Sequence, residues 1–285
     1  MNIALLSDIH GNGAALQAVL EDCKQRQIDQ YYFLGDYITD GPNVNSVLNC
    51  VRQLGSVVLR GNKEDYMLAF DAAKISPLQF KGHEYTYQRL KKDNLAYLAT
   101  LPMMQKIIAE GVKVLVYHGL PEITRKVFHP IRDAETAERL LREYDCDVYV
   151  GGHIHIPYEH RIQGRLFVNP GSVGLPMRCN GFSYGILKIE KGFYSYEQRI
   201  IPYEWEHIKE QLLTNKQHYL DAVGIWSELF LTSLQSNTDV TFDFLKLAYE
   251  TAGIEVTVGN TKGIDDESFA KAMQIWNRRI TKGSE

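Results

Sequence analysis

Five short apolar runs in the first 155 residues each end in a side chain that can bind a metal ion. The side chains at these ends are Asp8 and His10, Asp36, Asn62, His118, and His153 and His155. The runs are typical of buried strands, and helical patterns separate the first three, which predicts a parallel sheet. Ligands in open α/β sheets gather at the carboxyl ends of the strands. The recurrence therefore predicts an α/β fold with a metal site at one edge of a sheet.

The first of these ends places a carboxylate and an imidazole two residues apart after the apolar run Ile3–Leu6. If the chain stays extended there, Asp8 and His10 point to the same face, because strand side chains alternate. Taken alone, each group also has a structural explanation: a capping residue at Asp8, a turn residue at Asp36, a core histidine at His118. The coincidence of all five favours a metal site. Its oxygen and nitrogen donors suit divalent Mn, Fe, Zn, Co or Ni, and among these we expect Mn first.

The rest of the composition narrows the class of protein. The chain has 285 residues, 45% of them hydrophobic, which suffices for one large domain or for a domain with an appendage. Its net charge of -4 includes no basic block, so nucleic acid is not an expected partner. The four cysteines form no CxxC, which favours reduced, mostly buried thiols. The sequence shows no signal-like or membrane-spanning apolar stretch, so we expect a soluble, cytoplasmic protein without a membrane partner.

The apolar periodicity also predicts the order of elements along the chain. We expect strands at residues 3–6, 31–34, 56–59, 112–116, 147–150 and 165–168, and a hairpin formed by residues 184–189 and 193–201. We expect helices at residues 12–27, 44–54 and 133–144, and a mostly helical stretch over residues 62–101 with a loop at Ser76-Pro77.

From Pro202 onward the strand signals fade and amphipathic helices follow. We therefore expect an α/β domain over residues 1–202 and a helical C-terminal extension over residues 203–285. Two stripes rich in Trp and Phe, within residues 223–230 and 269–280, mark the extension. It is either a packing element or dimer arm, which would make a homo-oligomer, or a lid over the metal cleft. We favour the first, because exposed aromatic stripes seek burial.

The ordered motifs carry a family resemblance. The motifs are Asp8-x-His10, Gly35-Asp36, Gly61-Asn62, His118-Gly119 and Gly152-His153-x-His155. In this order they resemble the blocks of the calcineurin-like metallophosphoesterase superfamily. The Asn-Pro-Gly-Ser-Val-Gly of residues 169–174 is similar to the segment that follows the last histidine motif in the short, bacterial, YfcE-like branch. The resemblance implies a four-layer α/β/β/α sandwich of two mixed sheets, and residues 1–202 would be the catalytic domain.

The resemblance also implies a site for two metal ions. Carried over by residue, one ion would be bound by Asp8, His10, Asp36 and His155, and the other by Asp36, Asn62, His118 and His153. The bridging Asp36 and the ligand Asn62 would then be catalytic. Two cations about 4 Å apart activate a water and bind a phosphate oxygen, so we predict hydrolysis of a small-molecule phosphate ester or nucleotide by metal-activated hydroxide. The alternatives are a phosphomonoesterase or protein phosphatase of the same fold, or a non-catalytic scaffold. The complete ligand set argues against the scaffold.

Lys63 departs from the family pattern, because many members have a histidine there that protonates the leaving group. With an ordinary pKa of about 10.4, a lysine is a poor acid at neutral pH. Lys63 is then either a solvated side chain or a cation that contacts phosphate. The second reading favours phosphodiesters and phosphoanhydrides with acidic leaving groups over alkyl monoesters. Asp40 stands where the branch often has an aromatic residue.

Other residues near the motifs have weaker signals. Asn12 and Arg60 flank the ligands and are candidates for binding the substrate phosphate. Ser172 lacks a G-x-S-x-G elbow, so we expect it to be a turn residue rather than a nucleophile. Histidines outside the motifs, among them His83, are expected to have no role in the site.

Overall fold

The computed structural model describes residues 1–71, 78–214, 216–255 and 263–283, with side chains up to residue 279, and the loop predicted at Ser76-Pro77 lies outside these residues. The strands are β1 (Asn2–Leu6), β2 (Gln30–Phe33), β3 (Gly55–Val58), β4 (Met104–Ala109), β5 (Val112–Tyr117), β6 (Val148–Val150), β7 (Tyr158–Ile162), β8 (Arg165–Asn169), β9 (Phe182–Glu190) and β10 (Phe193–Ile201). The helices are α1 (Gly13–Lys24), α2 (Val44–Leu54), α3 (Asn62–Leu68), α4 (Lys81–Arg89), α5 (Lys92–Thr100), α6 (Ala134–Tyr144), α7 (Trp205–Leu213), α8 (Gln217–Val223), α9 (Ile225–Ser236), α10 (Val240–Thr251) and α11 (Asp266–Gly283).

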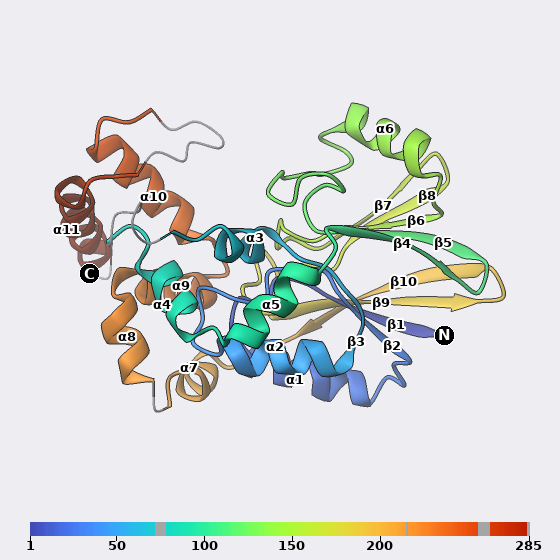
Figure 1. The fold of residues 1–285 in the computed structure, drawn as a ribbon, viewed down its shortest axis with the longest axis horizontal. Helices are drawn as coiled ribbons and strands as arrows, with labels where there is room; N and C mark the ends of the chain where they lie inside the picture. Colours follow the sequence, from blue (N-terminus) through green and yellow to red (C-terminus); the bar gives the residue numbers. More distant parts are fainter. Residues whose placement is uncertain (72–77, 215, 256–262, 284–285) are drawn as a thin grey trace.

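Two five-stranded sheets form the centre of the molecule (Figure 1). The first has the order β10-β9-β1-β2-β3, in which β1, β2 and β3 are parallel and the β9–β10 hairpin is antiparallel. The second has the order β4-β5-β6-β8-β7, with β5, β6 and β8 parallel and an antiparallel strand at each edge. Both sheets are therefore mixed, as predicted.

The edge strands β4 and β7 were not predicted from the sequence. Both are half-exposed, and in β7 no residue is fully buried. An edge strand that covers little core has no reason to carry the apolar run by which buried strands are found.

The alternation of side chains along β1 produces the layers. Ile3 and Leu5 pack in the core between the two sheets, together with Val114 of β5 and Val148 of β6. Leu6, on the opposite face of β1, packs in the core beneath α1 and α2. Helix α6 covers the outer face of the second sheet (Figure 1). The result is the predicted α/β/β/α sandwich.

The helices after β10 pack on the sandwich and on one another (Figure 1). Ile208 of α7 and Phe230 of α9 join the core beneath α1 and α2. Leu229, Phe244 and Phe269 form a separate core of the extension. Both predicted stripes are thus covered within the chain, although the Ile280 side chain lies outside the described side chains. A second copy is not needed to bury them, and the homo-oligomer stays a prediction.

Two further expectations concern the chain as a whole. The four cysteines are free thiols, and three of them are buried, as predicted. No helix in the described part of the chain is long and apolar enough to cross a membrane.

Candidate metal centre

Six of the seven predicted ligands lie in loops just beyond the strands, and the seventh, Asn62, is the first residue of α3. β1 ends at Leu6, and Asp8 and His10 both have positive φ angles, 56° and 51°. The stretch is therefore not extended, so the alternation that would place both side chains on one face of a strand does not apply here. The reason is that the loop turns to run beside the one after β2: Asp8 N donates to Gly35 O at 3.0 Å and His10 N to Asp36 O at 3.0 Å. Asp and His adopt the left-handed region more readily than most residues do.

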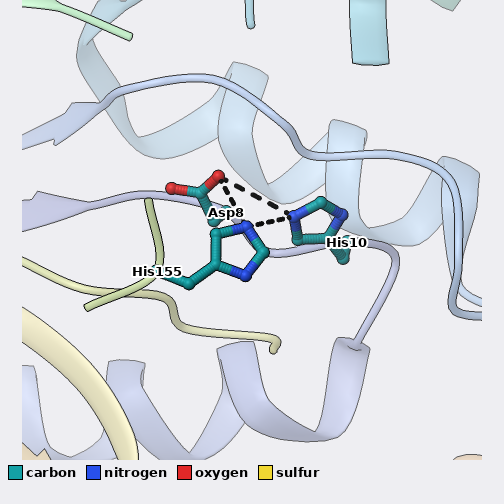
Figure 2. Close-up of side chains that lie close together, drawn as sticks. All are labelled: Asp8, His10 and His155. Atoms are coloured by element: carbon teal, nitrogen blue, oxygen red, sulfur yellow. Dashed lines mark hydrogen bonds and ion pairs between the residues drawn. The ribbon is translucent and has the colours of Figure 1, made fainter. Parts of the chain in front are cut away.

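Asp8, His10 and His155 form the first group of side chains (Figure 2). The Nε2 atoms of His10 and His155 are 3.0 Å apart. Asp8 Oδ1 lies 3.2 Å from His155 Nε2 and 3.7 Å from His10 Nε2. The outer ring nitrogens have other partners: His155 Nδ1 lies 3.0 Å from Leu175 O, and His10 Nδ1 lies 2.7 Å from Asp40 Oδ2. These partners fix the ring orientations so that Nε2 of each histidine faces Asp8.

Asp36, His118 and His153 form the second group. His118 Nε2 lies 3.4 Å from Asp36 Oδ1 and 3.1 Å from Asn62 Oδ1. Its Nδ1 lies 2.8 Å from Leu34 O, which ties the end of β5 to the end of β2 across the two sheets. The ring centroids of His118 and His153 are 5.1 Å apart. The amide oxygen of Asn62 thus joins a group that is otherwise carboxylate and imidazole.

Asp36 lies between the two groups. Its Oδ1 faces His118, and its Oδ2 lies 4.0 Å from His10 Nε2. Within each group the ligand atoms lie within 4.8 Å of one another. The structure thus brings the seven predicted side chains together, in the groups Asp8, His10 and His155 and Asp36, His118 and His153, with Asn62 beside His118.

The electrostatics of the two groups favour positive charge. Burial alone would raise the pKa of Asp36, but the charge of His118 lowers it to about 2. Burial alone would lower the pKa of both His118 and His10. Asp36 instead raises the pKa of His118 to about 9. Asp40 and Asp8 raise the pKa of His10 to about 10. Buried carboxylates therefore stabilise cations here.

A metal ion fits this arrangement. Asp8 Oδ1 is buried and, among the residues that the structure describes, accepts no hydrogen bond, although two imidazole nitrogens face it. A bound cation would supply the missing partner. The donors here are carboxylate oxygens, imidazole nitrogens and an amide oxygen, without a thiolate. Carboxylates and neutral imidazoles bind divalent first-row metal ions directly.

Glu64 supports the loops and was missed in the sequence. It is fully buried; its Oε2 accepts from the N–H groups of Asp36 and Gly61, both at 2.8 Å, and its Oε1 from that of Tyr37 at 2.8 Å. Burial and the charge of Asp36 raise the pKa of Glu64 to about 7, even though these donors favour the carboxylate. The bond from Gly61 N to Glu64 is one half of a capping box at the start of α3, but Gly61 has no side chain for the other half, so the usual sequence signature of the box is absent.

Two glycines of the motifs are required by this geometry. Gly35 has a φ of 107°, where a side chain is strained. A Cβ at Gly61 would collide with Asp36 Oδ1. These close approaches explain why glycine precedes Asp36 and Asn62.

The predicted substrate-binding residues differ in their surroundings. Asn12 is buried: its Oδ1 caps α1 by accepting from Ala15 N, and its Nδ2 donates to Gly174 O at 2.9 Å. Arg60 pairs with Asp65 at 2.6 Å. Both side chains are thus engaged in structural contacts.

Lys63 and Asp40, the two departures from the family pattern, are in contact: Lys63 Nζ lies 3.5 Å from Asp40 Oδ2. His83, expected to be unrelated to the site, lies within electrostatic reach of this pair; burial and the positive charge of Lys63 lower the pKa of His83 to about 4.

Ser172 donates to Asp8 O at 2.7 Å and accepts from Leu175 N at 2.8 Å, as expected of a turn residue.

Comparison with known proteins agrees with this geometry. The calcineurin-like phosphoesterase superfamily domain matches residues 1–192. An uncharacterized protein of Methanocaldococcus jannaschii is 31% identical over 245 residues, which are 75% of this chain and 93% of that protein. The phosphodiesterase YfcE of Escherichia coli is 28% identical over 194 residues, 66% of this chain and 87% of its own length, in line with the expected branch.

Among solved structures, a metallophosphoesterase from Sphaerobacter thermophilus has the same fold, with a TM-score of 0.67 and 23% identity over 84% of this chain and 100% of that one. A hypothetical protein from Pyrococcus horikoshii has a TM-score of 0.65 and 18% identity over 80% and 97% of the two chains. With the domain match covering the whole sandwich up to β9, the chain belongs to the calcineurin-like phosphoesterase superfamily.

Proposed function

We propose that the protein is a phosphoesterase that uses two divalent metal ions to hydrolyse phosphate esters. The position of Asp36 carries the proposal, because its two oxygens face an imidazole of each group, at 3.4 Å and 4.0 Å. A carboxylate so placed can bind two cations at once. In this proposal Asp36 belongs to both ligand sets, with Asp8, His10 and His155 in one and Asn62, His118 and His153 in the other.

Two bound cations would lower the pKa of a water molecule and neutralise charge on the phosphate. The residues of the chain orient the ligands for this: carbonyl oxygens of Leu34 and Leu175 hold the outer nitrogens of His118 and His155. Lys63 has a different role. Burial alone would lower the pKa of Lys63, but the charges of Asp40 and Asp36 raise it above its ordinary value. It is thus a fixed cation for a phosphate oxygen and not a proton donor.

The lack of a proton donor at Lys63 bears on the substrate. A leaving group that needs no protonation departs as an anion, as a nitrophenolate or a nucleoside phosphate does. We therefore propose that phosphodiesters with acidic leaving groups and phosphoanhydrides, in small molecules or nucleotides, are hydrolysed better than alkyl monoesters. The name of the relative YfcE supports the diester part of this preference.

The test is an assay of the full chain stripped of metal with a chelator and then supplied with Mn²⁺. The substrates are bis(p-nitrophenyl) phosphate, p-nitrophenyl phosphate, a dinucleoside polyphosphate and glycerol phosphate. We expect Mn²⁺-dependent hydrolysis of the diester and the anhydride, and the slowest rate on glycerol phosphate. Fast, Mn²⁺-dependent turnover of monoesters alone would make it a phosphomonoesterase. No hydrolysis of any substrate, with no metal bound, would favour a scaffold.

The division of the chain is part of the same proposal. We assign catalysis to residues 1–202 and a supporting role to residues 203–285. The end of β10 at Ile201 and the start of α7 at Trp205 support a boundary at this point.

A further inference from the structure

Asp40 is outside the proposed ligand set, yet it connects three parts of the molecule. Its Oδ2 lies 2.7 Å from His10 Nδ1, and Lys63 Nζ lies 3.5 Å from the same oxygen. Thr39 Oγ1 donates to this oxygen at 2.9 Å. The backbone carbonyl of Asp40 accepts a hydrogen bond from Tyr219 Oη, which comes from α8 in the C-terminal helices.

The loop around Asp40 needs this external contact. Thr39 and Asp40 both have positive φ angles, 74° and 59°, a backbone conformation that costs free energy unless neighbouring structure imposes it. The Tyr219 hydroxyl supplies one such contact, and the Tyr219 side chain is 1% exposed, so its position is fixed by the surrounding helices. The C-terminal helices thereby hold the carboxylate that faces His10.

The second histidine of the first group has a similar support. His155 Nδ1 lies 3.0 Å from Leu175 O, and the same loop is joined to the C-terminal helices by Arg178 N, which donates to Asn237 O at 3.2 Å. The second group differs. His118 Nδ1 lies 2.8 Å from Leu34 O at the end of β2, within the sandwich itself.

We infer that Asp40 positions His10, and that the C-terminal helices stabilise the first group of ligands, Asp8, His10 and His155, through Tyr219 and Asn237. A partner on the outer nitrogen of a metal-binding imidazole fixes the ring and raises its basicity, and its loss typically weakens metal affinity 10- to 100-fold. The extension is then part of the support of one metal site. This inference rests on the proposed function, since it takes His10 as a metal ligand.

The experiment is a calorimetric titration of the metal-free full chain with Mn²⁺. Two variants break the connection: Asp40→Asn at the carboxylate, and Tyr219→Phe at the hydroxyl. The matched control is Tyr203→Phe, because Tyr203 Oη also donates to a backbone carbonyl, that of Leu234, at 2.7 Å. That carbonyl belongs to α9, and no hydrogen bond in the described structure links it to a ligand.

We expect Asp40→Asn to weaken one of two Mn²⁺ sites about 10- to 100-fold and to leave the other unchanged. Tyr219→Phe removes one neutral hydrogen bond and should weaken the same site about 3- to 10-fold, with activity recovered at saturating Mn²⁺. Tyr203→Phe should bind Mn²⁺ within about twofold of the unaltered chain, with a similar decrease in unfolding temperature to that of Tyr219→Phe.

The possible failures are separable. Mn²⁺ affinity in Tyr219→Phe within about twofold of that of the unaltered chain, or an equal loss in Tyr219→Phe and Tyr203→Phe, would overturn the role of Tyr219. Unchanged affinity at both sites in a folded Asp40→Asn would overturn the role of Asp40. If the unaltered chain binds no Mn²⁺, the proposed function itself fails, whatever the variants do.

Discussion

The loops that carry the candidate metal ligands and the C-terminal helices are buried by opposite means. The loops bury charged groups: Asp8 and His118 have no exposed surface, and ion pairs and backbone hydrogen bonds surround them. The helices bury rings: Phe244 and Phe269 are also fully buried, among apolar neighbours. Because burial of a charge is unfavourable without partners, the loops depend on the elements around them, whereas apolar area stabilises the helices directly. Changes to the candidate ligands should therefore mainly affect activity, and changes to the apolar core of the helices should mainly affect stability.

The largest effect is expected for Asp36→Asn. The amide cannot bind two cations as the carboxylate can, so kcat/KM on bis(p-nitrophenyl) phosphate should decrease by at least about 1,000-fold and one Mn²⁺ should be lost. Steady-state kinetics and metal analysis measure both. A variant that keeps two Mn²⁺ ions and more than a tenth of the activity would show that Asp36 does not bridge.

Phe244→Ala tests the opposite region. Removing a buried ring from the core of the extension should lower the free energy of unfolding by about 3–5 kcal/mol. Urea denaturation of the metal-free chain gives this value. The folded fraction should still bind Mn²⁺ with nearly unchanged affinity, since the ring contacts that the structure describes for Phe244 are with Trp226, Phe269 and Trp276 and not with Tyr219. A large loss of affinity in the folded protein would remove the contrast between the two regions.

Lys63→Ala tests the fixed cation in the loops. We expect about a 10- to 100-fold loss of kcat/KM on the activated diester, with the unfolding temperature little changed, because the proposed contact of the Lys63 charge with the phosphate is lost. Kinetics across pH 6–9 should show the same loss at each pH, since the side chain does not donate a proton. Unchanged kinetics on every substrate would mean that Lys63 has no role in turnover.

Glu64→Gln tests how much one buried acceptor stabilises the loops. The amide nitrogen of Gln cannot accept a hydrogen bond, so at least one of the three backbone N–H groups loses its partner. The expected cost is about 1–3 kcal/mol in the free energy of unfolding. Urea denaturation at pH 7 measures it, and a value within about 0.3 kcal/mol of the unaltered chain would mean that Glu64 does not support the loops.

The smallest effect is expected for Asp22→Asn, a reference carboxylate outside both regions. Burial raises the pKa of Asp22, but hydrogen bonds from Tyr184 and Arg199 lower it below 3.8 overall. A lowered pKa in the folded state stabilises the protein above pH 3.8, and this stabilisation is lost as the pH falls through the folded pKa. The variant should be about 1 kcal/mol less stable at pH 7, and the difference should close below about pH 4. A gap that persists in acid would assign the effect to packing rather than to charge.

The sequence predicted most of the sandwich, and it identified the side chains that the structure brings together at the candidate metal centre, for physical reasons. Buried strands such as β5 must be apolar, and a metal site needs Asp and His at strand ends, so both leave a pattern that can be recognised. The edge strands β4 and β7 leave none, because half-exposed strands accept polar residues.

Other features depend on contacts between segments far apart in the chain. The left-handed conformation of Asp8 and His10 results from the neighbouring β2 loop, and the role of Tyr219 results from a carbonyl 179 residues away. Likewise, the burial of the aromatic stripes within the chain could not be read from their spacing, since the same stripe suits an intramolecular core and a dimer interface.

The place of β1 in the first sheet has a consequence for biosynthesis. β1 pairs with β2 on one side and with β9 on the other, and β9 begins only at Phe182. At translation rates of about 5–20 residues per second, the nascent N-terminal strand has one open hydrogen-bonding edge for several seconds or more after β2 has emerged from the ribosome. An apolar strand with an open edge is a site of mispairing, so this interval is when the growing chain most needs a chaperone.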